Sequence, residues 1–363
     1  MRSSLPLSWG TKLPIAGHRA SSWWRLFLTY TFLTSCISGY EPKLAPDNPK
    51  LTVDGLITNQ PGPYKVTLRY STPYVNDETI FLRFEADAEV TIRDDLGNEI
   101  PLNNVNAGEY LTDPTFMGQV GRTYVLHVKL PDGTTYESLP EAMAPVPPID
   151  TVYTTYEELF GTFLRGEFSV FLDFTDIAGT ENRYRWDWTH YRFEQYCRLS
   201  QIEYGTYRAT KCCGPCWSIE QCYSCINLIS DRFYDGKRIA GLPVLKIPYA
   251  SKEPYFVQIR LWSLTESAYQ FWRTVSEQID NSGGIFDKPP VTIRGNVFNT
   301  NDRSEQVLGY FGVSAQFERS IYIPRDYIKE IPFGITTPIY NELIGCMQCE
   351  VGPFRTDIEP RGW

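Results

Sequence analysis

The sequence predicts a mainly β protein, with an N-terminal β-sandwich and a larger β-rich domain that carries one amphipathic helix and a Cys-rich insert. Aromatic residues make up 15% of the 363 residues and include 24 tyrosines, whereas there are only 4 methionines. This composition favours sheets over helix bundles. Short segments with an apolar residue at every second position recur between turn sequences, while a helical period occurs once.

The first 35 residues have the parts of a lipoprotein signal peptide. Four basic residues precede an apolar run over 26–33, and no acidic residue occurs before Glu41. That run is too short to span a bilayer, which takes about 20 residues. It closes with Leu33-Thr34-Ser35-Cys36, which is typical of a lipobox. We expect a signal peptide over 1–35, lipid attachment at Cys36 and a polar, proline-containing tether over 36–50. The long basic segment leaves the true translation start open.

The net charge is negative, because 34 Lys and Arg stand against 43 Asp and Glu. Four of the basic residues lie in the predicted leader, so the mature chain is more acidic still. Such a charge argues against nucleic acid as a partner and against electrostatic binding to anionic lipid.

A β-sandwich is predicted over 51–140. Apolar residues alternate from Val66 to Tyr70, from Val90 to Ile92 and from Tyr124 to Leu130. The last of these strands continues through Pro131-Asp132-Gly133 into a hairpin. His127 falls on the polar face of this hairpin, where we expect solvent. Dense prolines then predict an extended linker over 141–150.

The second domain, over 151–363, is predicted to be β-rich around one helix. The helix is indicated by Ser263 with Glu266, which resembles a capping box, and by an apolar stripe of helical period. That stripe is expected to pack on the sheet, and Asn281–Gly284 to end the helix. The stripe is Ala268, Phe271, Trp272, Val275 and Ile279, and the predicted strands are 168–174, 184–188, 256–262, 291–298 and 307–317.

Aromatic side chains occur on both faces of the strand that follows Tyr184. Trp186 and Trp188 have one parity, and Tyr191 and Phe193 have the other. Since a strand has only one face toward its core, one set of rings is free to form a contact surface. The alternative is that all four pack in the core.

Eight cysteines follow Cys36, all in the second domain, and six of them define a Cys-rich insert over 197–225. Outside the cytoplasm the default for an even set is disulfides. Three CxxC pairs leave open a structural zinc site or a redox site, although the first two pairs are closer together than zinc pairs usually are. Cys346 and Cys349 would tie the C-terminal segment to the insert. The eight are Cys197, Cys212, Cys213, Cys216, Cys222, Cys225, Cys346 and Cys349.

No motif selects a catalytic residue, a metal or a cofactor. The chain contains neither Gly-x-Ser-x-Gly nor His-Glu-x-x-His. His190 continues the parity of Trp186 and Trp188, and is expected to be packed rather than catalytic. Residues 299–305 offer calcium-friendly oxygens but are better explained as a polar turn. A hydrolase that uses a carboxylate pair remains the enzymatic alternative.

One segment is specific enough to suggest a family. The run from Gly295-Asn296-Val297 to Leu308-Gly309-Tyr310-Phe311, together with the lipobox, the proline-rich junction and the insert, resembles the Bacteroidota outer-membrane lipoproteins of domain-of-unknown-function family 4249. The resemblance implies an immunoglobulin-like N-terminal sandwich and a non-enzymatic accessory or binding role, with a TonB-dependent transporter as partner. No catalytic residue is carried over.

These observations together predict a lipid-anchored, outer-membrane accessory or binding subunit. The cell surface is favoured over the periplasmic face, although residues 37–41 lack an acidic run that would direct the protein outward. The ligand, the partner's identity and the disulfide connectivity are left open.

Overall fold

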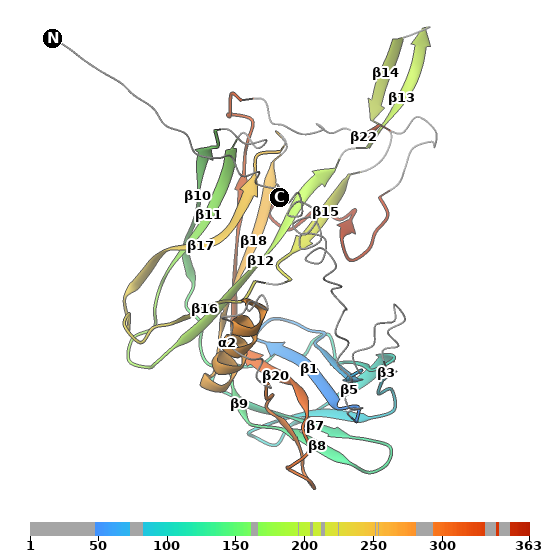
Figure 1. Cartoon of the computed structure of the whole chain (residues 1–363), viewed down its shortest axis with the longest axis vertical. Coiled ribbons are helices and arrows are strands. Elements are labelled where there is room, and N and C mark those ends of the chain that lie inside the picture. Colours follow the sequence, from blue (N-terminus) through green and yellow to red (C-terminus); the bar gives the residue numbers. More distant parts are fainter. Residues whose placement is uncertain are drawn as a thin grey trace, which may run out of the picture. The chain divides into compact units, whose positions relative to one another are not determined.

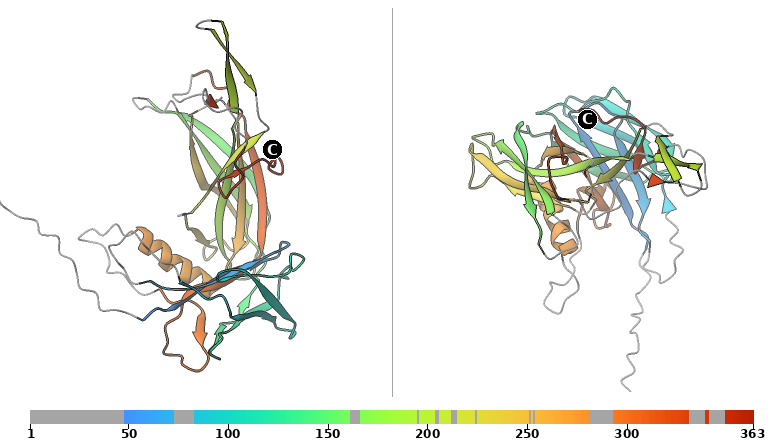
Figure 2. Two further views of the ribbon diagram at one scale, coloured as in Figure 1. Left: turned by 90° about the vertical axis from the view of Figure 1, so that its right-hand side faces the viewer. Right: turned by 90° about the horizontal axis from the view of Figure 1, so that it is seen from above.

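A computed structural model describes residues 48–363 apart from 73–82, 161–165, 195, 204–205, 212–214, 224, 251, 253, 281–292, 331–338 and 341–348. The predicted mainly β class is confirmed, because strands dominate this part of the chain and α2 (Glu266–Asp280) is its single helix (Figures 1 and 2). Among the described residues, no helix has the length and apolar character needed to cross a membrane.

The N-terminal sandwich forms where the alternation predicts it. Buried Val53, Leu68, Ile92 and Leu126 share one core, with tyrosines and valines of neighbouring strands around them. Its strands are β1 (Leu51–Thr58), β2 (Lys65–Tyr70), β3 (Arg83–Phe84), β4 (Glu89–Asp94), β5 (Glu99–Asn106), β6 (Glu109–Leu111), β7 (Thr123–Lys129), β8 (Thr135–Ser138) and β9 (Glu141–Ala142).

Two strands from late in the sequence complete this sandwich. The order β19-β8-β7-β4-β5-β6-β2-β1-β20 begins with β19 (Val297–Asn299) and ends with β20 (Leu308–Ser314). β20 runs parallel to β1, with Val53 opposite Gly309 (Figure 1). The expected boundary at residue 140 therefore differs from the strand pairing, because long-range partners of an edge strand leave no local signal.

Gly309 makes the parallel pairing close. Its φ of 86° lies in the left-handed region, and a Cβ there would collide with the carbonyl oxygen of Val53. The carbonyl oxygen of Gly309 in turn occupies the space that a Cβ on Gly295 would need. Both glycines lie in the segment that carries the family resemblance, and their role is a close approach of backbones.

The predicted linker over 141–150 is packed rather than free. Glu141 and Met143 have no exposed surface, β9 pairs with β7, and Ile149 already begins the next strand. Proline density correctly indicates an extended chain. It does not reveal that polar and apolar side chains between the prolines enter the core.

A second sandwich is formed by strands that lie mainly between residues 149 and 323. One sheet has the order β10-β11-β17 and the other β21-β18-β12-β15-β23, with β16 paired to β12. Phe168, Leu172, Trp186 and Ile259 belong to the core that these strands share. The strands are β10 (Ile149–Glu158), β11 (Gly166–Thr175), β12 (Arg183–Glu194), β15 (Cys216–Gln221), β16 (Asn227–Ser230), β17 (Arg238–Pro248), β18 (Tyr255–Ser263), β21 (Gln316–Ile323) and β23 (Arg355–Thr356).

The predicted insert contributes two strands of a separate three-stranded sheet. It has the order β14-β13-β22 and is formed by β13 (Tyr196–Glu203), β14 (Thr206–Lys211) and β22 (Ile339–Tyr340). Of the predicted strand over 291–298, residues 293–296 are not strand, β19 starts at Val297, and residues 291–292 lie outside the described range.

Ser263 lies where the chain crosses from one sandwich to the other. Its backbone N–H donates to the carbonyl of Ala315, its hydroxyl donates to the carbonyl of Ala144 at 2.7 Å, and it accepts from the N–H of Ala315 at 2.9 Å. Ala315 is the single residue between β20 and β21. The expected capping role of Ser263 is therefore wrong, since this residue belongs to β18.

Thr265 caps the helix instead. Its hydroxyl accepts from the N–H of Ala268 at 3.1 Å, which satisfies one of the free donors of the first turn. Ala268 is buried, and Phe271 and Trp272 pack beside Tyr310 of β20. Ile279, by contrast, is 53% exposed, so the apolar stripe is covered only along its first half.

Candidate functional site

A cavity of about 450 Å³ lies under α2, and we call it the α2 pocket. It is lined by the helix, by β1 and β20 of the first sandwich, and by β12 and β18 of the second. Phe271, Trp272 and Val275 form the helix wall, and Leu56 faces it from β1. Ligand pockets usually measure 300–1,000 Å³ and combine apolar walls with a few polar groups. The α2 pocket is of this kind.

Arg185 brings a positive charge to this pocket. It is a half-buried residue of β12, and its guanidinium carbon lies 4.2 Å from the centroid of the Trp272 ring. Its Nε is buried and has no hydrogen-bond partner among the residues that the structure describes. Burial lowers the pKa of Arg185, because a desolvated guanidinium is harder to charge. The pocket thus contains a cation whose hydrogen-bonding capacity is incompletely used.

The nearest acid on the same strand face is already engaged. Asp187 accepts a 2.7 Å bond from Nε of Arg260, and Arg260 also donates to the hydroxyl of Thr189. Trp262, which follows on the same face of β18, has a buried indole N–H that finds no acceptor in the described part of the chain. Two donors around the pocket, on Arg185 and Trp262, therefore lack an acceptor.

A buried carboxylate fixes the helix wall. Oε1 of Glu141 accepts from Ser267 at 2.8 Å and from Tyr310 at 2.5 Å, and Oε2 accepts from Thr265 at 2.5 Å. Asn296 adds a longer contact of 3.3 Å. Burial, followed by the charge of Glu141, raises the pKa of Tyr310. These bonds hold the first turn of α2 against β9 and β20, and a carboxylate there also complements the helix dipole.

Two other cavities are less suited to a small ligand. The larger, of about 890 Å³, is more open to solvent and is bordered by Tyr64, Gln316 and Glu318. The smaller, of about 330 Å³, contains His127, whose Nδ1 lies 3.1 Å from Glu137 on the neighbouring strand. His127 is partly exposed on the outer face of the hairpin, as expected.

The four rings considered as a possible contact surface are buried or partly covered. Trp186 is buried in the second core, and Trp188 packs half-buried against it. The opposite parity is covered as well, since Tyr191 contacts Phe256 and Phe193 contacts Trp217. Trp363 lies against Phe193, Trp217, Phe256 and Tyr322, so the end of the chain covers rings that the strand alone would leave exposed.

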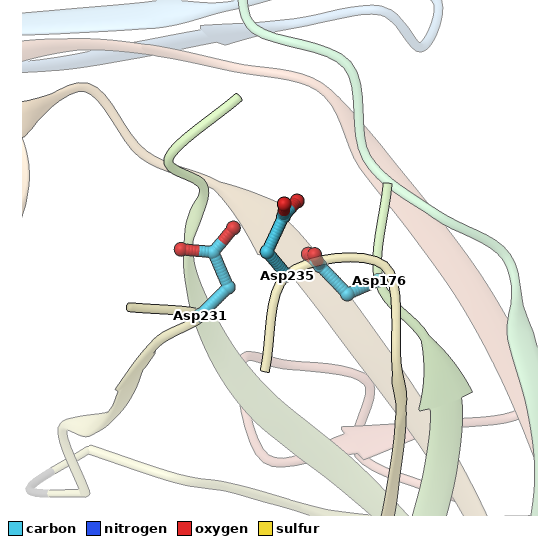
Figure 3. Close-up of side chains that lie close together, drawn as sticks. All are labelled: Asp176, Asp231 and Asp235. Atoms are coloured by element: carbon cyan, nitrogen blue, oxygen red, sulfur yellow. The ribbon is translucent and has the colours of Figure 1, made fainter. Parts of the chain in front are cut away.

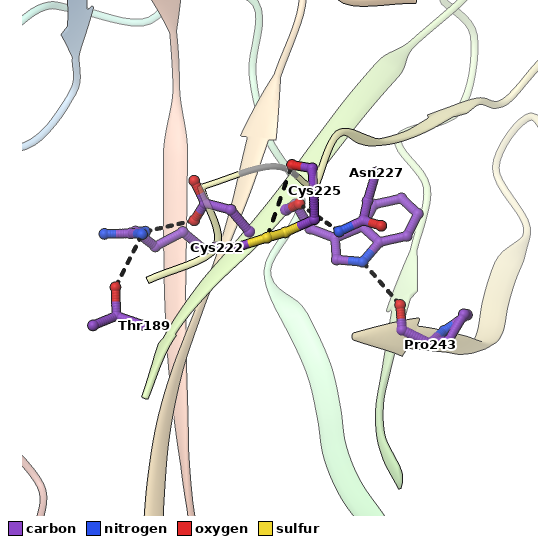
Figure 4. The surroundings of a disulfide bond; sticks show 8 residues. Thr189, Cys222, Cys225, Asn227 and Pro243 are labelled. Carbon is purple, nitrogen blue, oxygen red and sulfur yellow. Dashed lines mark hydrogen bonds and ion pairs between the residues drawn. A yellow bond between two sulfur atoms is a disulfide. The ribbon is translucent and has the colours of Figure 1, made fainter. Parts of the chain in front are cut away.

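Two disulfides link cysteines of the described residues. Cys216 of β15 pairs with Cys349 across 133 positions, and Cys222 pairs with Cys225 (Figure 4). Beside the second pair, Asn227 donates to the carbonyl of Trp186 at 3.2 Å. The C-terminal segment is thus tied to the insert, as expected. Cys36, Cys212, Cys213, Cys346 and the side chain of Cys197 lie outside the described residues.

His190 is packed, as the parity of β12 predicts. It is 8% exposed, its ring lies 4.5 Å from that of Tyr255, and its Nε2 has no partner. Burial, followed by the charges of Arg192 and Arg325, lowers its pKa to about 4. His190 is therefore neutral at pH 7 and is packed among aromatic and charged side chains.

The predicted polar turn after β19 is also found. Oδ1 of Asn299 accepts from the N–H groups of Asn301 and Asp302, while Glu305 accepts from Asn299 and from the hydroxyl of Tyr136. The oxygens that might have held calcium are thus used within the turn.

Sequence reasoning did not single out the cluster of Asp176, Asp231 and Asp235 (Figure 3). Their ligand atoms lie within 4.8 Å of one another, so these carboxylates could hold a cation. Asp176 accepts from Tyr184 and from the N–H of Gly236. Burial raises the pKa of Asp231, the like charge of Asp176 raises it further, and an N–H bond from Asn182 offsets part of the increase. The cluster lines none of the three cavities.

The comparison with protein families bears on the whole of this architecture. The model of a domain of unknown function, DUF4249, matches residues 37–320, which is more than half of the chain. The chain belongs to the DUF4249 family. This confirms the family suggested by the run from Gly295 to Phe311. In this DUF4249 protein that run supplies β19, β20 and the close approach at Gly309.

Comparison with solved and curated proteins adds little about this DUF4249 protein. A segment of two fibronectin type-III domains from chicken tenascin has 17% sequence identity and a TM-score of 0.16. The match covers 59% of this chain and 91% of the tenascin segment. None of the curated proteins matches the chain in sequence. The fold assignment therefore rests on the strand pairing itself.

Proposed function

We propose that this DUF4249 protein is a lipid-anchored, non-enzymatic binding subunit at the outer membrane, and that a TonB-dependent transporter is its partner. The α2 pocket is the observation that carries the binding role. The described residues that line it include two arginines, two aspartates and several aromatic rings, but no His, Cys or Lys. One of the two aspartates, Asp187, is already held by Arg260, and such a lining suits recognition of a ligand.

The anchor rests on the sequence. Leu33-Thr34-Ser35-Cys36 closes an apolar leader, and Cys36 precedes the folded part by a short polar tether. A lipoprotein with more than one acyl chain stays attached to its membrane, because each buried methylene contributes about 0.8 kcal/mol. The acidic charge of the chain supports a protein partner rather than a nucleic acid.

The partner is tested by affinity purification. The full chain with a C-terminal tag is captured from detergent-solubilised outer membrane, and an unrelated lipoprotein of similar abundance serves as the control. We expect a TonB-dependent transporter to be enriched with the tagged chain and not with the control lipoprotein. Equal recovery of transporters with both proteins would contradict the transporter partner.

The anchor is tested by Cys36→Ala. We expect the variant to lose its acyl chains and to accumulate either as an uncleaved precursor or as a soluble envelope protein. Continued fractionation as a lipidated membrane protein would show that the lipobox interpretation is wrong. Protease treatment of intact cells with the unaltered chain then distinguishes the cell surface from the periplasmic face.

A further inference from the structure

The α2 pocket contains a cation whose hydrogen-bond donors are not all used by the described residues. Arg185 is stacked on Trp272, and its buried Nε has no partner. Asp187, two residues along the same face, is held by Arg260 at 2.7 Å. A buried donor of a charged group that finds no acceptor is costly, and a bound anion that accepts from it would relieve that cost. The pocket is thus electrostatically suited to an anionic group.

The surroundings of Arg185 restrict the anion to a small charge. Asp54 and Asp187 also line the cavity, so its lining already contains two carboxylates beside Arg185 and the exposed Arg69. A dianion such as a phosphate would be repelled by these acids, whereas a single carboxylate matches one guanidinium. A planar carboxylate also fits the planar donor array of arginine.

The remaining walls require an apolar body. Trp272 and Phe271 present rings from the helix, and Leu56 and Val275 add aliphatic surface. The volume of about 450 Å³ is sufficient for a ligand with one ring or a short alkyl chain. Tyr310, held by Glu141, stacks on Phe271 at 4.7 Å and keeps this wall in place.

We propose that the α2 pocket binds a single carboxylate carried on an aromatic or aliphatic body, with the carboxylate on Arg185 and the body against Trp272 and Phe271. This inference rests on the proposed binding function and specifies its ligand class. A free organic acid and the C-terminal residue of a peptide both present this chemistry.

The test is a calorimetric titration of the full chain, purified in detergent. The probes are 3-phenylpropionate, its neutral amide, phenyl phosphate and a short peptide that ends in Phe with a free or an amidated C-terminus. We expect 3-phenylpropionate to bind, and its amide to bind at least about tenfold more weakly, because the charge-assisted bonds to Arg185 are lost. Binding of the free-ended peptide but not of 3-phenylpropionate would identify a chain terminus as the source.

Arg185→Gln should weaken binding of the carboxylate by about tenfold or more, whereas Arg273→Gln, on the exposed face of α2 and outside the lining of the cavity, should change it by less than about threefold. If Arg185→Gln does not fold, Val275→Trp replaces it. The indole ring then occupies space in the cavity that the ligand needs, while Arg185 is unchanged. The proposal would be overturned by equal affinity for the acid and the amide or by tighter binding of phenyl phosphate. Unaltered binding of 3-phenylpropionate to Arg185→Gln, or to Val275→Trp where that variant replaces it, would also overturn the proposal.

The two proposals fail separately. A transporter that co-purifies with Arg185→Gln as it does with the unaltered chain leaves the accessory role standing, whatever the titration shows. A bound carboxylate with no co-purifying transporter leaves the pocket assignment standing and removes the partner.

Discussion

The hydroxyl of Tyr310 donates a 2.5 Å hydrogen bond to Oε1 of Glu141, although the two residues are 169 positions apart. The same carboxylate accepts bonds from Ser267 and Thr265 in the first turn of α2. One fully buried side chain thus joins β9, β20 and the helix that covers the α2 pocket. The segment expected to be a linker contains the residue on which this junction depends.

Replacing that carboxylate should be costly. We expect Glu141→Gln to lower the free energy of unfolding by about 2–3 kcal/mol, because charge-assisted bonds from three hydroxyls become weaker and the new amide N–H₂ faces donors. Urea denaturation measures the effect. Glu109→Gln is the control, since Glu109 forms a solvent-accessible pair with Lys65 that contributes at most about 1 kcal/mol. Equal losses in the two variants would show that the Glu141 network adds no stability.

The backbone approach at β20 gives a second prediction. Gly309→Ala should lower the free energy of unfolding by about 3 kcal/mol or more, because the new Cβ meets the carbonyl of Val53 in addition to the strain of a positive φ. Gly97 has a similar φ of 83° and nothing within 4 Å of an added Cβ, so Gly97→Ala should cost only about 1 kcal/mol. Thermal unfolding of the pair separates collision from strain, and similar shifts would show that strain alone matters.

The long-range disulfide gives a third prediction. Cys349→Ser opens a loop of 133 residues, which in the chain-entropy model corresponds to about 5 kcal/mol. We expect faster hydrogen exchange in β15 and β23, with exchange in β1, β2 and β7 unchanged because the first sandwich contains no cysteine. Cys225→Ser opens a loop of three positions and is the control. Loosening of the first sandwich in Cys349→Ser would contradict this prediction.

The buried histidine gives a pH dependence. Unfolded His190 takes a proton near pH 6.5, whereas the folded residue does so only near pH 4, so the unfolded state binds more protons between these values. The contribution of His190 is complete above about pH 6.5 and is lost as the pH falls toward 4, by about 3 kcal/mol in total.

His190→Phe keeps a ring beside Tyr255 and removes the titrating group. We expect its free energy of unfolding to change less between pH 6.5 and 5 than that of the unaltered chain. Parallel pH profiles of the two proteins would contradict burial as the cause. The imidazole NMR signal of His190 is identified as the one that His190→Phe lacks, and titration of this signal above pH 6 would contradict burial as well.

Local patterns in the sequence predict most strands of both sandwiches. β7, β11 and β18 follow period-two runs, and α2 follows its apolar stripe. The same patterns cannot identify which strands pair. β19 and β20 contain ordinary alternating residues, and only the folded chain shows that they form the two ends of the first sandwich.

The candidate site was hidden for a related reason. Arg185 has the parity opposite to Tyr184 and Trp186, which in a strand indicates solvent. α2 covers that face, so Arg185, which its position in the strand predicts to be exposed, is half-buried under Trp272. In the same way, the sequence around Phe193 predicts an uncovered ring, whereas in the structure Trp363 lies against it. Helix coverage and chain-end packing are tertiary facts that alternation does not encode.

The parallel pairing of β1 with β20 determines when the first sandwich is finished. Because the chain is synthesised from its N-terminus, β1 is made well before residues 308–314, which form its partner β20. Until then its hydrogen-bonding edge stays open, which delays folding and invites association with other chains. A chaperone that binds the incompletely folded chain would protect such an edge. In a fragment that stops before residue 308, the edge stays open permanently.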